Sequence, residues 1–112
     1  MADIIAADRL KAKLDEGAQF ILLDVLPPSS YLVAHLPGAA NVPLDYLHDV
    51  MEVLPQDYEI IVYCRNRDCE LSQVAAQRLE LHGYTNVHRF KDGLAGWKQA
   101  GYELESLIEP SG

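Results

Sequence analysis

The sequence has 112 residues, of which 49% are hydrophobic and 23% are charged, and its formal net charge is −8. This length and composition predict one folded domain with its own core and argue against disorder. The acidic balance argues against nucleic acid and anionic membrane surfaces as partners, because both need a basic face. No apolar run approaches the roughly 20 residues that span a bilayer, and no basic segment precedes an apolar run at the N-terminus. We therefore expect a cytoplasmic protein.

Apolar runs alternate with helical patterns along the chain, which predicts an α/β fold: a central, mainly parallel five-stranded sheet with helices on both faces. The expected strands are residues 4–5, 20–24, 39–43 (a short strand or a loop), 59–63 and 86–90. The expected helices are residues 8–16, 27–34, 44–54, 71–82 and 94–99. In the helix at 71–82, the apolar spacing predicts burial of Leu71, Val74, Ala75, Leu79 and Leu81. One domain is expected over residues 1–105, followed by a C-terminal tail at 106–112.

Cys64 directly follows the apolar run at 60–63 and precedes a polar loop at 65–70 and a helix. The strand places this cysteine at the carboxyl edge of the sheet, where α/β proteins bind ligands. Loop N–H groups and the start of the helix favour a thiolate and attract an anion. An ordinary cysteine, with a pKa of about 8.5, is mostly protonated at neutral pH, so such a site has to lower that pKa. This order of strand, cysteine, polar loop and helix predicts that Cys64 is a nucleophile. The alternative is a buried cysteine that acts as a small apolar side chain.

The charge is unevenly distributed. Residues 1–63 hold 3 Lys and Arg against 10 Asp and Glu, whereas residues 64–112 hold 6 against 7. Arg65 and Arg67 lie in the loop and are candidate anion-binding residues, since a guanidinium pairs well with the oxygens of a small anion. The alternative is that they face solvent or pair with Asp68 and Glu70. The nearly neutral segment that begins at Cys64 is therefore expected to tolerate a small anion, although the protein as a whole is acidic.

The chain resembles a single-domain rhodanese, a sulfurtransferase domain, over about residues 8–101. The matching stretches are 23–25, 31–42 with its core at 35–41, 62–65, 75–76, 81–87 and 92–94 with Trp97. The resemblance implies the α/β fold and a Cys64 that moves sulfane sulfur from a small anionic donor, such as thiosulfate, to a thiol or protein acceptor. It implies no organic cofactor and no metal. It also implies a substrate-binding loop made of Arg65, Asn66, Arg67, Asp68, Cys69 and Glu70.

Three features depart from the common rhodanese pattern. The serine that usually begins the helix corresponds to Ser72, so the loop is about two residues longer. Leu26 stands where the family often has an arginine, two residues after the strand-ending Asp24. The loop lacks the family's glycine and reads Cys-Arg-x-x-x-Cys, a pattern similar to rhodanese domains found alone or fused to bacterial regulators. The resemblance therefore does not extend to substrate preference.

Cys69 is a candidate resolving thiol. A loop that curls round an anion could bring its sulfur to Cys64, provided that the two Cα atoms lie within about 7 Å. Cys69 would then displace sulfide from a persulfide or protect Cys64 from over-oxidation; the alternative is a side chain that points away. Asp24 is expected to fix nearby loop backbone and His35 to be a structural hydrogen-bonding residue. The histidines show no Cys/His spacing of a zinc site.

Three rival functions stay open. A phosphatase or arsenate reductase of related fold needs an arginine where this chain has Glu70, and a carboxylate there repels a doubly negative substrate. A dithiol redox switch would use Cys64 and Cys69 with no sulfane sulfur. A non-catalytic domain would present the loop to a protein partner. The sequence does not indicate an oligomeric state.

Overall fold

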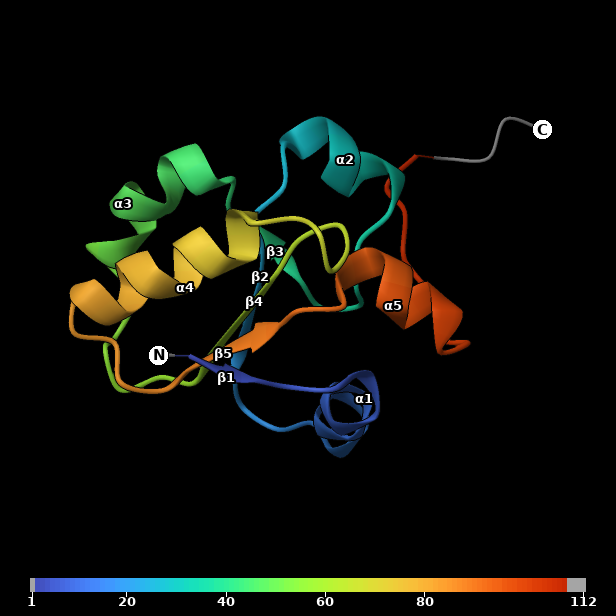
Figure 1. Ribbon diagram of the computed structural model, residues 1–112, viewed down its shortest axis with the longest axis horizontal. Helices are drawn as coiled ribbons and strands as arrows, with labels where there is room; N and C mark the ends of the chain where they lie inside the picture. Colours follow the sequence, from blue (N-terminus) through green and yellow to red (C-terminus); the bar gives the residue numbers. More distant parts are fainter. Residues whose placement is uncertain (1, 109–112) are drawn as a thin grey trace.

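The computed structural model describes residues 2–108 and contains a five-stranded sheet in which every pairing is parallel (Figure 1). The strand order is β1-β5-β4-β2-β3. The strands are β1 (Asp3–Ile4), β2 (Ile21–Asp24), β3 (Ala40–Asn41), β4 (Ile60–Tyr63) and β5 (Val87–Phe90). The helices are α1 (Ala7–Glu16), α2 (Pro28–Val33), the 3₁₀ helix η1 (Leu44–Tyr46), α3 (Leu47–Met51), α4 (Leu71–Leu81) and α5 (Gly93–Gln99). The predicted α/β architecture with a parallel sheet is confirmed.

Helices cover both faces of the sheet, so the central strand β4 is buried on both sides. In Figure 1, α3 and α4 lie on one side of the sheet, and α1 and α5 lie on the other. Ile60, Val62 and Cys64 pack in the core that includes Leu79 of α4. The intervening residues Ile61 and Tyr63 belong to the opposite core, which contains Leu10, Phe90 and Trp97. This two-sided burial explains why β4 is a continuous apolar run in the sequence.

Two expectations about the helices were wrong in detail. The single helix expected at 44–54 is η1 followed by the five-residue helix α3. Leu81 is 85% exposed, although it was expected to be buried. It lies two residues after buried Leu79, and two steps of about 100° turn a side chain to the opposite side of a helix. Ser72 and Ala76 are buried on the packed side of α4 instead.

A buried hydrogen-bond network at Asp24 fixes the chain at the carboxyl ends of β2 and β4. The hydroxyl of Tyr63 donates to Asp24 Oδ2 over 2.7 Å and accepts from the amide of Leu36 over 3.0 Å. The other carboxylate oxygen of Asp24 accepts from the amide of Leu26 over 3.0 Å. Burial raises the pKa of Asp24, although these hydrogen bonds oppose that shift. Burial and the nearby Asp24 charge also raise the pKa of Tyr63.

The segment that follows α5 is held against α2 by backbone hydrogen bonds. His35 and Glu105 form an antiparallel bridge, with N–O distances of 2.9 and 2.8 Å. The amide of Leu107 donates to the carbonyl of Leu32 over 3.0 Å. The boundary at 105 stays a prediction, because residues 109–112 of the expected tail lie outside the described part of the chain. No helix among residues 2–108 combines the length and apolarity that crossing a membrane requires.

We predict that the Asp24→Asn variant has a different pH dependence of stability from the wild type. The pKa of Asp24 is raised above its ordinary value of 3.8, so the folded protein holds a proton that the unfolded chain releases. The contribution of this carboxyl to stability is complete below pH 3.8 and is lost as the pH rises through the raised pKa of the folded state. Denaturant unfolding of both proteins between about pH 3 and 7 should show that the free energy of unfolding of the wild type falls relative to that of the variant as the pH rises. A pH-independent difference would contradict this.

Candidate active site

Cys64 lies immediately after β4, at the carboxyl edge of the sheet, and is 1% exposed. Its carbonyl oxygen accepts a hydrogen bond of 3.1 Å from the amide of Leu94, and the Arg65 carbonyl accepts one of 2.9 Å from Ala95. Both donors lie in the first turn of α5. The backbone on which the sulfur sits is therefore fixed by β4 before it and by α5 beside it.

Gly93 makes this close approach possible. Its φ is +63°, in the left-handed region that favours glycine. A Cβ atom at this position would lie 2.5 Å from the carbonyl oxygen of Cys64 and 2.8 Å from the carbonyl carbon of Arg65. Because both are backbone atoms, neither can give way as a flexible side chain would. A side chain at residue 93 therefore has to displace either α5 or the Cys64 loop.

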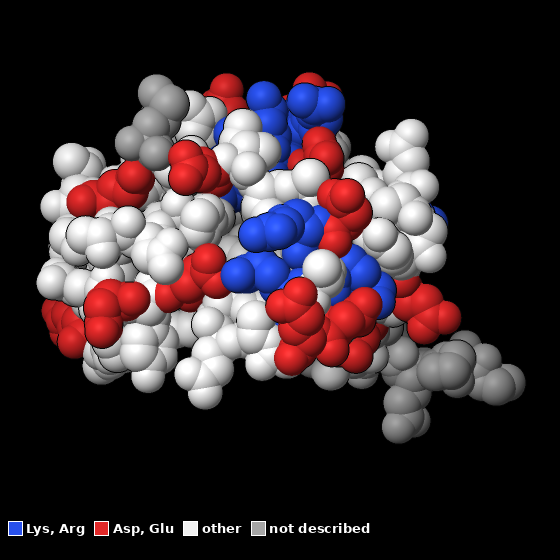
Figure 2. Space-filling model, turned by 90° about the horizontal axis from the view of Figure 1, so that it is seen from below, with Lys and Arg blue, Asp and Glu red and all other residues white. Residues whose placement is uncertain are grey.

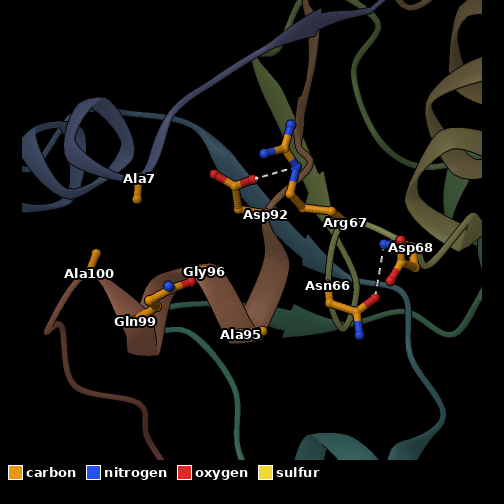
Figure 3. A pocket seen from close by; sticks show the side chains of 9 residues that line it. All are labelled: Ala7, Asn66, Arg67, Asp68, Asp92, Ala95, Gly96, Gln99 and Ala100. Atoms are coloured by element: carbon orange, nitrogen blue, oxygen red, sulfur yellow. Dashed lines mark hydrogen bonds and ion pairs between the residues drawn. The ribbon is translucent and has the colours of Figure 1, made fainter.

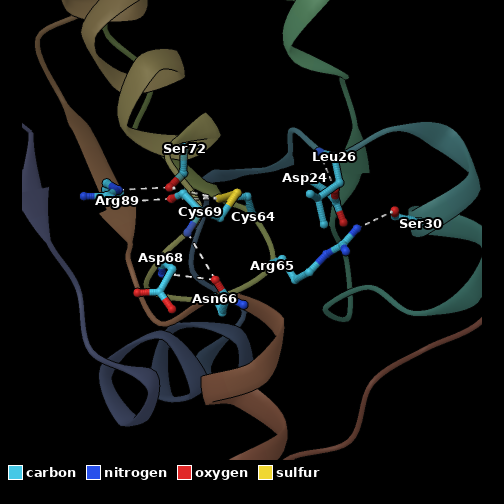
Figure 4. Close-up of a disulfide and its surroundings, with 10 residues drawn as sticks. All are labelled: Asp24, Leu26, Ser30, Cys64, Arg65, Asn66, Asp68, Cys69, Ser72 and Arg89. Carbon is cyan, nitrogen blue, oxygen red and sulfur yellow. Dashed lines mark hydrogen bonds between the residues drawn. A yellow bond between two sulfur atoms is a disulfide. The ribbon is translucent and has the colours of Figure 1, made fainter.

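Cys64 and Cys69 form a disulfide at the base of the loop (Figure 4). Their Cα atoms are 6.4 Å apart, within the usual range of about 4.4–6.8 Å for bonded cysteines. Cys69 is half-buried, whereas Cys64 is buried. The loop thus brings together the two sulfurs that the sequence places five residues apart.

Asn66 organises the loop between the two cysteines. Its side-chain oxygen accepts hydrogen bonds from the amides of Asp68 (3.0 Å) and Cys69 (3.1 Å). The amide of Cys69 also lies 3.2 Å from the Asn66 carbonyl oxygen. The sequence led us to expect loop amides that turn inward to hold an anion. In the disulfide form, these two amides bind Asn66 instead.

Arg89 and Ser72 form a polar contact with Cys64 that the sequence reasoning did not identify. Arg89 Nε donates to the Ser72 hydroxyl oxygen over 2.9 Å, and that oxygen lies 3.5 Å from Cys64 Sγ. Arg89 Nη2 also lies 3.5 Å from the carbonyl oxygen of Cys69. Arg89 is in β5 and lies in register with Val62 of β4. Val62 precedes Cys64 by two residues. One hydroxyl group therefore links the Arg89 guanidinium to Cys64 Sγ.

The two loop arginines occupy different surroundings. Arg65 Nη2 donates to the Ser30 hydroxyl over 3.2 Å, on the α2 side of the loop (Figure 4). Arg67 is mostly exposed to solvent, as one of the expected alternatives had it, and its Nε lies 3.3 Å from Asp92 Oδ1, an ion pair that was not among the alternatives. Asp68 and Glu70 are exposed. Of the two loop cations, Arg67 thus has a carboxylate as its ion-pair partner, whereas Arg65 contacts a neutral hydroxyl.

Two pockets flank the loop, and neither is lined by a cysteine. The first, of about 460 Å³, has lining side chains from the loop and from α5 (Figure 3). It contains Asp68 and the Arg67–Asp92 pair. The second, of about 360 Å³, is lined by Ser29, Ser30, Val33, Ala34, Arg65 and Leu94. The second pocket has a cation and no carboxylate, so it is electrostatically the better place for an anion.

His35 is engaged away from the loop. It is 4% exposed, its Nδ1 lies 2.8 Å from the carbonyl oxygen of Tyr31, and its ring stacks on the Tyr31 ring at 3.9 Å. Leu26, at the position of the family's arginine, is buried in the core. Within residues 2–108, no three His, Cys, Asp or Glu side chains gather in an arrangement that could hold a metal ion.

The net charge of −8 does not describe every part of the surface. Figure 2 shows one face on which Lys and Arg side chains gather near the middle, with Asp and Glu side chains around them. Two lysines form close ion pairs with carboxylates: Lys11 with Asp15 and Lys13 with Glu59, both at 2.7 Å. These two cations are therefore balanced by nearby carboxylates and do not offer an unpaired positive charge to an anion.

The profile of the rhodanese-like domain family matches residues 6–100. An HTH-type transcriptional regulator, Rv0324, from Mycobacterium tuberculosis is 33% identical over 90 residues, which are 80% of this chain and 39% of the regulator. A sulfurtransferase from Allochromatium vinosum is 24% identical over 112 residues, the whole of both chains. The crystal structure of a thiosulfate sulfurtransferase from Pseudomonas aeruginosa has a TM-score of 0.83 and 26% identity, over 96% of this chain and 21% of that one.

The match covers most of the chain, so the protein belongs to the family of rhodanese-like domains. This agrees with the resemblance that the sequence motifs indicated. The chain spans well under half of the length of the regulator, so that relationship concerns one region of a larger protein.

Gly93→Ala should weaken both the fold and the site. The left-handed conformation alone costs about 1–2 kcal/mol for a residue with a Cβ, and contact with the Cys64 and Arg65 backbone adds to that cost. Gly17→Ala is a matched control, because Gly17 has a φ of +70° with nothing within 4 Å of its would-be Cβ. Thermal unfolding and the reaction rate of Cys64 with a sulfane donor measure both effects. Equal losses in the two variants would show that α5 does not constrain the loop.

Arg89→Met should reduce the reactivity of Cys64 at neutral pH. A hydrogen bond to a charged group contributes about 1.5–3 kcal/mol, so we expect a rate loss of about tenfold or more and a shift of the pH–rate midpoint to higher pH. Arg89→Lys should recover part of the rate. Arg78→Met removes an exposed cation from α4 and is the charge control. An unchanged pH midpoint in Arg89→Met would rule out this effect of Arg89 on the sulfur.

Proposed function

We propose that this protein is a sulfurtransferase that carries sulfane sulfur on Cys64. The observation on which this rests is the position of Cys64: at the carboxyl end of the buried strand β4, in a loop with cations on two sides. The relatives support sulfur transfer in general, since one is named a sulfurtransferase and a structural neighbour is named a thiosulfate sulfurtransferase.

The proposed donor is thiosulfate or another small anion with a terminal sulfane sulfur. Reduction of the disulfide comes first, because a disulfide sulfur is not a nucleophile. The Cys64 thiolate then attacks the outer sulfur of thiosulfate, the donor S–S bond breaks, and sulfite leaves with the bonding electron pair. Cys64 becomes a persulfide, and a thiol or other nucleophile takes the outer sulfur in a second step. The need for reduced cysteines fits a reducing compartment such as the cytoplasm.

The Arg65 pocket is the proposed route for the donor. Its lining combines the Arg65 guanidinium with the hydroxyls of Ser29 and Ser30 and contains no carboxylate. The pocket beside Arg67 has two carboxylates, from Asp68 and Asp92, which repel a doubly charged anion. On the other side of Cys64, the Ser72 hydroxyl, bound to Arg89, is a donor that supports negative charge on sulfur.

The Cys64–Cys69 disulfide favours a second candidate, a dithiol redox switch without sulfur transfer. Intact mass separates the two. A gain of one sulfur atom after thiosulfate treatment supports transfer, whereas loss of two hydrogens under mild oxidant, with no sulfur uptake from any donor, supports the switch. Phosphatase chemistry has less support, because Glu70 places an exposed carboxylate at the start of α4.

Cys64→Ser should abolish sulfur transfer from thiosulfate to cyanide, because a serine hydroxyl cannot form a persulfide. The measurement is thiocyanate formation by reduced protein, together with sulfite release. Cys69→Ser is the matched control: it also removes one thiol from the same loop, yet it should still release sulfite and yield thiocyanate. Wild-type rates from Cys64→Ser would end the proposal.

A further inference from the structure

We propose that Cys69 expels the transferred sulfur from Cys64 as sulfide, so that the protein also acts as a thiol-dependent sulfane reductase. This inference rests on the proposed function, since Cys64 must first become a persulfide. It adds a second exit for the sulfur atom: instead of passing to an external acceptor, the atom leaves as sulfide while the two cysteines become a disulfide.

The geometry of the loop allows Cys69 to attack Cys64. The two cysteines are bonded with Cα atoms 6.4 Å apart, so the folded loop can bring Cys69 Sγ onto Cys64 Sγ. The hydrogen bonds from the amides of Asp68 and Cys69 to Asn66 hold this turn. Because attacking and attacked sulfurs belong to one short loop, their reaction is intramolecular and competes well with a free acceptor at low concentration.

The step balances as follows. The thiol of Cys69 loses its proton and attacks the Cys64 sulfur, the bond between that sulfur and the outer sulfur breaks, and the outer sulfur leaves as hydrosulfide with the electron pair and the proton. The outer sulfur is reduced, and the two cysteine sulfurs are oxidised to the disulfide. Two molecules of a low-molecular-weight thiol, or one dithiol, then restore both cysteines and become a disulfide themselves. Overall, thiosulfate and two thiols yield sulfite, hydrogen sulfide and one external disulfide.

The burial of the two sulfurs sets the direction of re-reduction. Cys64 is 1% exposed, whereas Cys69 is half-buried, so an external thiol reaches Cys69 first. Attack there releases Cys64 as the leaving thiolate. That thiolate forms beside the Ser72 hydroxyl, which Arg89 holds at 2.9 Å. A stabilised leaving thiolate speeds thiol–disulfide exchange, and it regenerates the residue that has to attack the next donor.

The test is a single turnover. Wild-type protein is reduced, freed of reductant without exposure to air, and mixed with one equivalent of thiosulfate in the absence of any added thiol; sulfite, sulfide and intact mass are then measured. We expect one equivalent each of sulfite and sulfide and a final mass lower by two hydrogens. The Cys69→Ser and Cys69→Ala variants should release one equivalent of sulfite and no sulfide, and should gain one sulfur atom. With dithiothreitol present, the Cys69 variants should release sulfide only after dithiothreitol has attacked the Cys64 persulfide. Their sulfide should therefore appear later than that of the wild type.

The outcomes separate this inference from the function on which it rests. Sulfite without sulfide from the wild type, with one sulfur atom retained, would overturn the role of Cys69 and leave the sulfurtransferase intact. In the reaction without added thiol, equal sulfide release from the wild type and both Cys69 variants would also overturn it. If neither wild type nor variant releases sulfite, both proposals fail together. Because the first of these results needs only the wild type, a poorly folded variant cannot obscure the answer.

Discussion

The site depends on backbone hydrogen bonds that hold Cys64 from two directions. β4 pairs with β2 on one side and β5 on the other, and the Val25 amide continues that pairing by donating to the Tyr63 carbonyl over 3.2 Å. The amides of Leu94 and Ala95 then bind the next two carbonyls of the chain. Since these bonds involve main-chain atoms, the Cα of Cys64 is fixed whatever the length of the loop that follows. A longer loop can therefore change what surrounds the sulfur without moving its anchor.

Most of the fold could be predicted from the sequence because a parallel sheet covered on both faces leaves an unmistakable apolar run, as in β4. The burial of Leu81 was mistaken because apolar character alone does not fix which side of a helix packs. Arg89 was missed because a charged residue in a strand usually indicates a solvent-facing side. Its spacing of two from buried Val87 was the available sign that both share the face covered by α4. The sequence alone did not show whether the loop amides bind the Asn66 side chain or turn inward to hold an anion.

Charge in this protein acts locally. Arg65 and Arg89 lie on opposite sides of the Cys64–Cys69 disulfide (Figure 4), and each hydrogen-bonds a serine hydroxyl. Arg67 faces Asp92. Exposed charges farther than about 8–10 Å away are largely screened in physiological salt, so the distant acidic residues have little influence on a donor that is already in contact. The surplus of carboxylates instead disfavours extended polyanions, which would have to touch many of them.

The outer strands of the sheet are only two residues long: Asp3–Ile4 at one edge and Ala40–Asn41 at the other. An unpaired sheet edge is a template on which another polypeptide can add a strand, and long apolar edges are sites of aggregation. Edges this short, one of them followed closely by Pro43, offer few free main-chain donors and acceptors. A neighbouring molecule therefore finds little main chain at either edge on which to extend the sheet.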